Sequence, residues 1–143
     1  MNKIFKNFMF RVGAEVVNES KAIAPFKTGN LKKDIQVFKA DQTSVTIGNS
    51  KLAPYAKFVH FGTKPHMIKV KKAKALANKN GKVFGKKVNH PGTKANPYLK
   101  NALDSYIKGS AFTRAKTALA NEVKNKIVND IKKQLNRAFN GIF

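Results

Sequence analysis

Apolar residues recur at intervals of three and four positions in both end regions of the chain, and this spacing predicts helices there. The first pattern covers residues 3–24 and stops before Pro25, because proline disfavours the helical region for the preceding residue. A second predicted helix runs from Pro97 to about Tyr106. After a break at Gly109–Ser110, a third runs over residues 112–139. Its apolar stripe, which we expect to face a core or a partner, comprises Leu119, Val123, Ile127, Ile131, Leu135 and Phe139.

The middle of the chain has the shorter periods and turn residues of β-structure. Residues 35–39 and the β-branched run at 45–47 predict two strands joined by a short turn. Residues 64–89 predict a long, lysine-rich hairpin arm, with Asn80-Gly81 as its tight turn. Because its apolar content is low, we expect this arm to be flexible until it meets a partner. The stretch from Tyr55 to Phe61 fits a strand or a helical turn, and its periodicity leaves both open.

Together these elements predict an α+β fold. It has an N-terminal helix, a small and mostly antiparallel sheet carrying the arm, and two C-terminal helices packed on the sheet. The length of 143 residues and the hydrophobic content of 42% are those of one globular domain, which we place at residues 1–143. No internal repeat is apparent.

Several classes of protein are disfavoured by what the sequence lacks. There is no cysteine, which excludes disulfide frameworks and thiolate chemistry. No apolar run approaches the roughly 20 residues of a membrane span. The N-terminal segment resembles a signal peptide briefly, but Arg11 and Glu15 interrupt it, so we expect an amphipathic helix and a protein made and used inside the cell.

The net charge of +22 is concentrated in the middle of the chain, where no acidic residue occurs between Asp41 and Asp104. Such a surface attracts nucleic acid or an acidic protein, and the alternative is a basic face that is merely solvated. Because the chain has only three arginines and few aromatics in the arm, any DNA contact is expected to be independent of sequence. The candidate contacts to DNA or an acidic partner are Lys69, Lys71, Lys72, Lys74, Lys82, Lys86 and Lys87.

Candidate catalytic and metal-binding groups are sparse. His60, His66 and His90 could suggest a metal site, but the nearest acidic residues in the sequence are remote from all three. No serine lies in a nucleophile elbow, and no glycine-rich loop precedes a helix start. We therefore predict no catalytic, metal or cofactor-binding residue, and no enzyme activity.

Three motifs follow one another in a fixed order: APFKTGNLKKDI, PYAKFVHFGT and HPGTKANPYLKNAL. Two of them contain Gly-Thr, which by itself indicates a turn that leaves a strand. In order and spacing the three resemble the neck or tail-completion proteins of long-tailed bacteriophages, typified by the gene-ten-product family of lambdoid phages. The matching or interface-candidate positions are Pro25, Thr28, Gly29, Asn30, Leu31, Tyr55, Ala56, Phe58, Val59, Phe61, Gly62, Thr63, His90, Pro91, Gly92, Thr93, Pro97, Tyr98 and Leu99.

The resemblance implies a structural protein of the virion at the junction of neck and tail, assembled in the host cytoplasm. It implies a homo-oligomeric ring, most simply a hexamer, that contacts other connector and tail proteins and takes no cofactor. Two positions depart from the family pattern: His60 stands where an acidic residue is usual, and Asp34 where serine is usual. The alternatives are a non-specific basic nucleic-acid-binding protein and, from the C-terminal helix, a cationic membrane-active protein; we expect no membrane contact.

Overall fold

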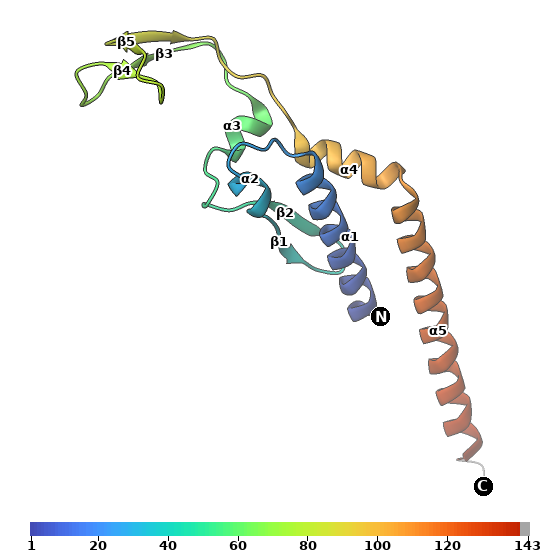
Figure 1. Cartoon of the computed structure of the whole chain (residues 1–143). Helices are drawn as coiled ribbons and strands as arrows, with labels where there is room; N and C mark the ends of the chain where they lie inside the picture. The colour runs from blue at the N-terminus through green and yellow to red at the C-terminus, as the bar shows by residue number, and fades with distance from the viewer. Residues whose placement is uncertain (141–143) are drawn as a thin grey trace. The chain divides into compact units, whose positions relative to one another are not determined.

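The computed structural model describes residues 1–140 and has the predicted α+β class (Figure 1). Two compact units are present. One comprises Met1–Ala53 and the part of the chain from Tyr98 onward, and the other comprises Pro54–Pro97. In chain order the elements are α1 (Asn2–Ile23), α2 (Asn30–Lys33), β1 (Ile35–Ala40), β2 (Val45–Asn49), α3 (Ala56–Phe61), β3 (His66–Lys69), β4 (Leu76–Ala77), β5 (Val83–Gly85), β6 (Lys87–His90), α4 (Tyr98–Lys108) and α5 (Ser110–Asn140).

Helix α1 forms within one residue of the predicted bounds and buries one face. Val16 and Val17 lie in the core, and the buried hydroxyl of Ser20 donates to the carbonyl of Val16 at 2.7 Å. Gly13 is required where α1 meets β2, since a Cβ atom there would lie 2.4 Å from a methyl group of Val45. The helix thus packs directly on the sheet through its smallest residue.

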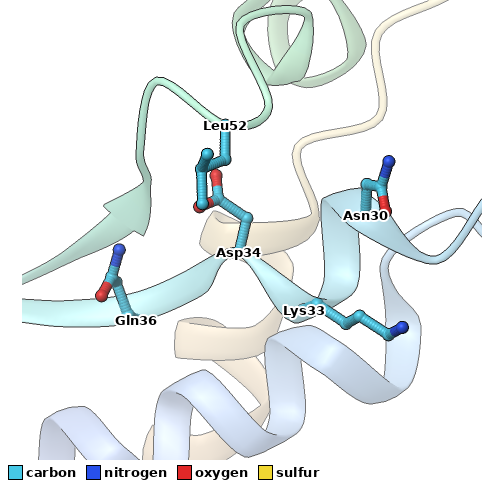
Figure 2. A pocket seen from close by; sticks show the side chains of 5 residues that line it. All are labelled: Asn30, Lys33, Asp34, Gln36 and Leu52. Carbon is cyan, nitrogen blue, oxygen red and sulfur yellow. The ribbon is translucent and has the colours of Figure 1, made fainter.

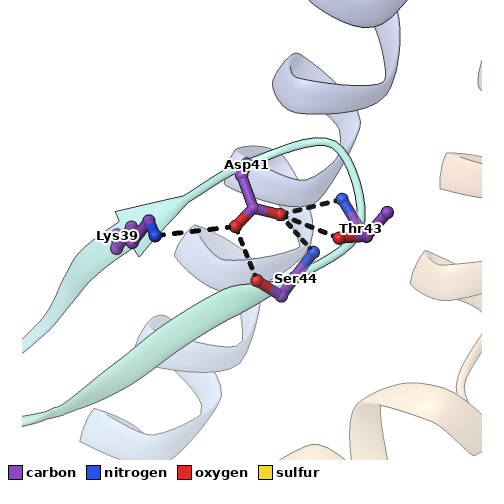
Figure 3. A network of polar contacts seen from close by, with 4 residues as sticks. All are labelled: Lys39, Asp41, Thr43 and Ser44. Atoms are coloured by element: carbon purple, nitrogen blue, oxygen red, sulfur yellow. Dashed lines mark hydrogen bonds and ion pairs between the residues drawn. The ribbon is translucent and has the colours of Figure 1, made fainter.

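Strands β1 and β2 form the predicted antiparallel hairpin, with Val37 opposite Ile47 and an irregularity before Lys39. Asp41 closes the turn between them (Figure 3). One of its carboxylate oxygens accepts from the backbone N–H groups of Thr43 and Ser44, at 2.9 and 2.7 Å, while the other accepts from the Ser44 hydroxyl.

The packing of the C-terminal helices differs from the prediction. Helices α4 and α5 lie mainly against α1, which itself lies on the β1–β2 sheet. Their shared core contains Val16, Ala102 and Tyr106, with Ile47 as the strand residue that reaches it. Helix α1 therefore separates the two helices from most of the sheet. It packs against β1 and β2 as well as against α4 and α5.

The second unit begins with α3, so the ambiguous stretch at residues 55–61 is helical. Strand β3 then pairs with β6, and β4 with β5, both antiparallel. Lys71, Lys72 and Lys74 fall in the irregular segment between β3 and β4, where like charges disfavour a regular ladder. At the tip, Gly81 adopts a φ of +79°, and the Asn78 side chain accepts from two backbone N–H groups of the turn.

Candidate functional site

The two Gly-Thr motifs meet in the second unit. Thr63 and Thr93 exchange two backbone hydrogen bonds, of 2.9 and 3.0 Å, which form an isolated antiparallel bridge. We call Gly62-Thr63 and Gly92-Thr93 together the Gly-Thr clasp. It closes the loop of chain that carries β3 to β6, so two motifs predicted only as separate turns form one structural feature.

The geometry of the clasp explains why each threonine follows glycine. Gly62 and Gly92 have φ angles of +72° and +86°, in the left-handed region that costs other residues free energy. A Cβ atom on Gly62 would lie 2.5 Å from the carbonyl oxygen of Thr93, and one on Gly92 would lie 2.3 Å from that of Thr63. Each glycine lets the opposite backbone approach.

Two histidines continue the ladder from the clasp. His66 and His90 are paired across β3 and β6, and their rings stack with centroids 5.0 Å apart. Nδ1 of His66 donates to the carbonyl of Lys64 at 2.9 Å, whereas Nδ1 of His90 accepts from the backbone N–H of Gly92 at 3.1 Å. These contacts hold each ring by its Nδ1 atom and give the predicted turn residue His90 a structural role.

On the other side of the clasp, α3 presents an aromatic ridge, which we define as Tyr55, Phe58 and Phe61. Their spacing of three residues places them along one side of the helical turn, and they are 40%, 56% and 71% exposed. The backbone N–H of Asn96 donates to the carbonyl of Val59 at 2.9 Å. The segment after the clasp thereby anchors the helix that bears the ridge.

His60 lies between two members of the ridge pattern in the sequence, at the position where the family usually has an acid. Its ring meets that of Phe61 edge-on, with centroids 4.7 Å apart. Burial lowers the pKa of His60 and thereby favours the neutral imidazole. A neutral ring here replaces the charge that a carboxylate would bring to the ridge.

The first and third motifs contribute residues to the core of the first unit. Gly29 takes a φ of +82° before α2, and Leu31 is buried. Tyr98 is only 1% exposed, and its hydroxyl donates to the side-chain oxygen of Asn49. The side-chain amide of Asn49 donates in turn to the carbonyl of Leu31 at 2.9 Å. Leu31 and Tyr98 therefore shape the fold of this unit, whereas Phe58 and Phe61 are presented to solvent.

Asp34, the other departure from the family pattern, lies at a cavity of about 450 Å³ (Figure 2). The carboxylate accepts from the backbone N–H of Ser50 at 2.7 Å and also from its hydroxyl. The Lys33 side chain points away from it. Asp34 thus holds the end of β2 in place, a role that its position in the sequence did not indicate. The residues that line the cavity are Asn30, Lys33, Asp34, Gln36 and Leu52.

The basic arm, residues 64–89, carries its charge without neutralisation. The ion pairs found among the described residues, such as Lys100 with Asp104 at 2.8 Å, all belong to the first unit. Lys82 lies over the Phe84 ring at 5.7 Å, an arrangement that leaves its charge available. The seven lysines singled out from the sequence are all exposed.

Other chemistry has little support in the part of the chain that the structure describes. Over residues 1–140, no three His, Cys, Asp or Glu side chains converge as a metal site would require. None of the helices described is both long enough and apolar enough to span a bilayer. The polar networks at Asp34 and Asp41 are internal supports for turns.

Comparison with known proteins finds a family similarity in the N-terminal part of the chain. Residues 1–62 match the model of the HK97-gp10-like family, described as "Bacteriophage HK97-gp10, putative tail-component". This confirms the predicted resemblance to a phage tail family over the first motif and nearly all of the second, while the third motif lies outside the matched residues. The family is one of structural components, not a known enzyme family. No curated protein and no solved structure gives a significant match.

Proposed function

From the match of residues 1–62 to a family of phage tail components, we propose that this chain is a tail-completion protein in the head–tail connector of a tailed phage or prophage. It assembles in the host cytoplasm as a ring, most simply a hexamer, and remains in the virion at the junction of neck and tail. The observation that carries the proposal is the aromatic ridge, held by the Gly-Thr clasp and exposed in the single chain.

The ridge supplies the adhesive part of this mechanism. Phe58 and Phe61 are 56% and 71% exposed on a short helix whose backbone is fixed at Val59. Burying each against a neighbouring subunit contributes on the order of 1–2 kcal/mol. A closed ring repeats this contact at every subunit interface, so the modest free energy gained at each interface adds up over the whole ring.

The basic arm supplies the electrostatic part. Its lysines repel one another in the free subunit, and an acidic surface on the adjoining ring turns the same charges into an attraction. Strands β3 and β6 can also gain backbone partners there. The arm then orders fully on docking, with its positive side facing the acidic ring or the DNA in the channel.

Removal of the gene from the producing phage tests the proposal. Electron micrographs of the lysate should contain filled heads and free tails that have not joined, and the wild-type gene supplied in trans should restore complete particles. A Phe58→Ser/Phe61→Ser variant should fold normally and fail to restore them, whereas Lys57→Ser, on an exposed position of the same helix, should succeed. Normal particles from the deleted phage would refute the assembly role.

A second candidate function is non-specific binding of nucleic acid, favoured by the acid-free stretch between Asp41 and Asp104. Lysines that only neutralise phosphates give an affinity that falls steeply with salt and ignores sequence. A fluorescence titration of duplex and scrambled duplex over a range of salt concentrations measures this. Tight binding at physiological salt by a chain that complements no assembly defect would favour this function over the connector role.

A further inference from the structure

Helix α5 has two different apolar faces along its length. The first is used inside the unit: Ala115 is buried and Phe112 packs against the core beside Tyr106, with ring centroids 5.5 Å apart. The second begins near Ile127 and is exposed throughout. Within the described residues, the second half of the helix therefore displays apolar side chains that the fold does not cover.

The four-residue step of the apolar stripe explains why one helix has two faces. Each step of four advances the side chain by roughly 40° around the axis, since an α-helix turns about 100° per residue. Five steps carry the stripe from Leu119 to Phe139, so these two side chains lie roughly 200° apart around the helix axis. A longer contact between α5 and α1 would therefore not bury both apolar faces of α5.

The exposed face is well defined. Ile127, Ile131, Leu135 and Phe139 are 45%, 50%, 51% and 60% exposed, and Val128 lies within the same arc. Side chains on the remaining circumference of this half are polar or charged. We call the face formed by these five residues the distal apolar face. Such a surface on a helix is typical of docking, in which an amphipathic helix enters a complementary apolar surface.

The charges around the distal apolar face select the kind of partner. From Val123 to Asn140 there is a single acidic residue, Asp130, and Lys126 already pairs with it at 2.6 Å. The unneutralised positive charges on this half belong to Lys124, Lys132, Lys133 and Arg137. By helical spacing, Lys124 and Lys132 lie beside the face, and the other two lie on the opposite side of the helix. A second copy of the chain would bring the same positive charges, whereas an acidic partner would neutralise them.

We propose that the distal apolar face of α5 binds a partner protein through an acidic, amphipathic helix, whose apolar stripe lies on Ile131 and Leu135 and whose carboxylates flank it. The proposal does not rest on the assigned place in the connector, since it follows from the winding of the stripe and from the local charge. It gives α5 a function separate from the aromatic ridge, which lies in the other unit.

The test uses the full chain and a synthetic helical peptide of about 20 residues, with a leucine stripe flanked by glutamates. Fluorescence anisotropy should show binding that weakens with salt, and a peptide with lysines in place of the glutamates should bind at least about tenfold more weakly. Ile131→Ala/Leu135→Ala should weaken binding of the acidic peptide about 30-fold while preserving helicity by circular dichroism. The matched control is Asn129→Ala/Asn136→Ala, on the polar side of the same turns, which should bind as the wild type does.

Three results would overturn the proposal. One is equal binding of the acidic and basic peptides, or none of either. Another is concentration-dependent self-association in sedimentation that the Ile131→Ala/Leu135→Ala variant abolishes, which would make a second copy the occupant. The third is tight binding to phosphatidylglycerol vesicles without peptide binding, which would make the face a membrane contact. An assembly defect in the phage would not by itself distinguish these, so the connector role and this proposal can fail independently.

Discussion

Thr63 and Thr93 donate their backbone N–H groups to each other's carbonyl oxygens, at 2.9 and 3.0 Å. This reciprocal pair joins two motifs separated by the whole basic arm. Closing such a loop costs conformational entropy, which the ladder between β3 and β6 helps to offset. The aromatic ridge comes directly before this bridge in the chain, and the basic arm is the loop that the bridge closes.

Replacing a clasp glycine tests this arrangement, and the chain provides a matched control. Gly92→Ala combines a φ of +86° with a Cβ atom 2.3 Å from the Thr63 carbonyl oxygen, whereas Gly85→Ala has the same φ and no atom within 4 Å. The strained dihedral alone costs about 1 kcal/mol, and the clash adds to it only at Gly92. Amide exchange at Thr63 and Thr93 should therefore accelerate strongly in Gly92→Ala and little in Gly85→Ala. Equal effects of the two substitutions would show that backbone conformation alone explains the glycines.

Asp41 should sustain the β1–β2 turn only while it is ionised. Hydrogen bonds from the Thr43 backbone, the Ser44 hydroxyl and the Ser44 backbone lower the pKa of Asp41 to about 2, from an ordinary value of 3.8. Because the folded pKa is depressed, its stabilisation is complete above pH 3.8 and is lost as the pH falls toward 2. NMR titration of the Asp41 side chain measures this directly.

The substitutions at Asp41 separate its accepting role from its charge. Asp41→Asn keeps an oxygen that can accept from both backbone N–H groups, whereas Asp41→Ala loses every acceptor. Amide protection at Thr43 and Ser44 should follow the order wild type, Asp41→Asn, Asp41→Ala at neutral pH. If Asp41→Ala retained full protection, the turn would not depend on the carboxylate.

Tyr106 should titrate far above an ordinary tyrosine. Burial raises the pKa of Tyr106 to about 12, and the neighbouring Glu15 carboxylate acts in the same direction. The folded state then holds a proton that the unfolded state releases near pH 10, so the stabilisation present below pH 10 is lost as the pH rises toward 12. The difference between the ultraviolet titrations of wild type and Tyr106→Phe should show a step near pH 12. A step near pH 10 would mean that the hydroxyl is solvated.

Local patterns predicted α1, α4, α5 and the first hairpin, because the information for these elements lies in neighbouring residues. The proline after Ala24 ends α1, and the β-branched run at 45–47 forms β2. Gly29 adopts a positive φ in the turn before α2. Features of this kind depend on backbone preferences within one turn or strand, which sequence expresses directly.

Long-range pairings were missed for the same reason. The bridge from Thr63 to Thr93 and the support of Ser50 by Asp34 join residues whose sequence neighbours carry no sign of the partner. The placement of α4 and α5 on α1 depends on which face of α1 is left after the sheet is covered. Periodicity identifies an apolar face but not the element that covers it. For the candidate site, the sequence motifs indicated which residues to consider. Only the structure showed that the two Gly-Thr motifs pair with each other.

The arm should be separable from the fold, and the pairing of β3 with β6 shows where to cut. Lys69 lies opposite Lys87, so excising residues 70–86 and joining these two by a short Gly-Ser linker preserves the ladder and the clasp. The excised segment offers few apolar anchors, and both Val83 and Phe84 are exposed, at 63% and 42%. Their burial offsets little of an ordering cost of roughly 1–2 kcal/mol per residue.

The shortened protein should unfold at nearly the temperature of the wild type and keep slow amide exchange at Thr63 and Thr93. It should nonetheless fail to complete tails in the phage, because it lacks the lysines that we propose meet the acidic ring or the DNA. A control that keeps the arm but exchanges Lys82, Lys86 and Lys87 for glutamine separates charge from shape, and it should fail in the same assay. Infectious particles from the shortened chain would show that the arm has no part in assembly, and a large drop in unfolding temperature would show that it belongs to the core of its unit.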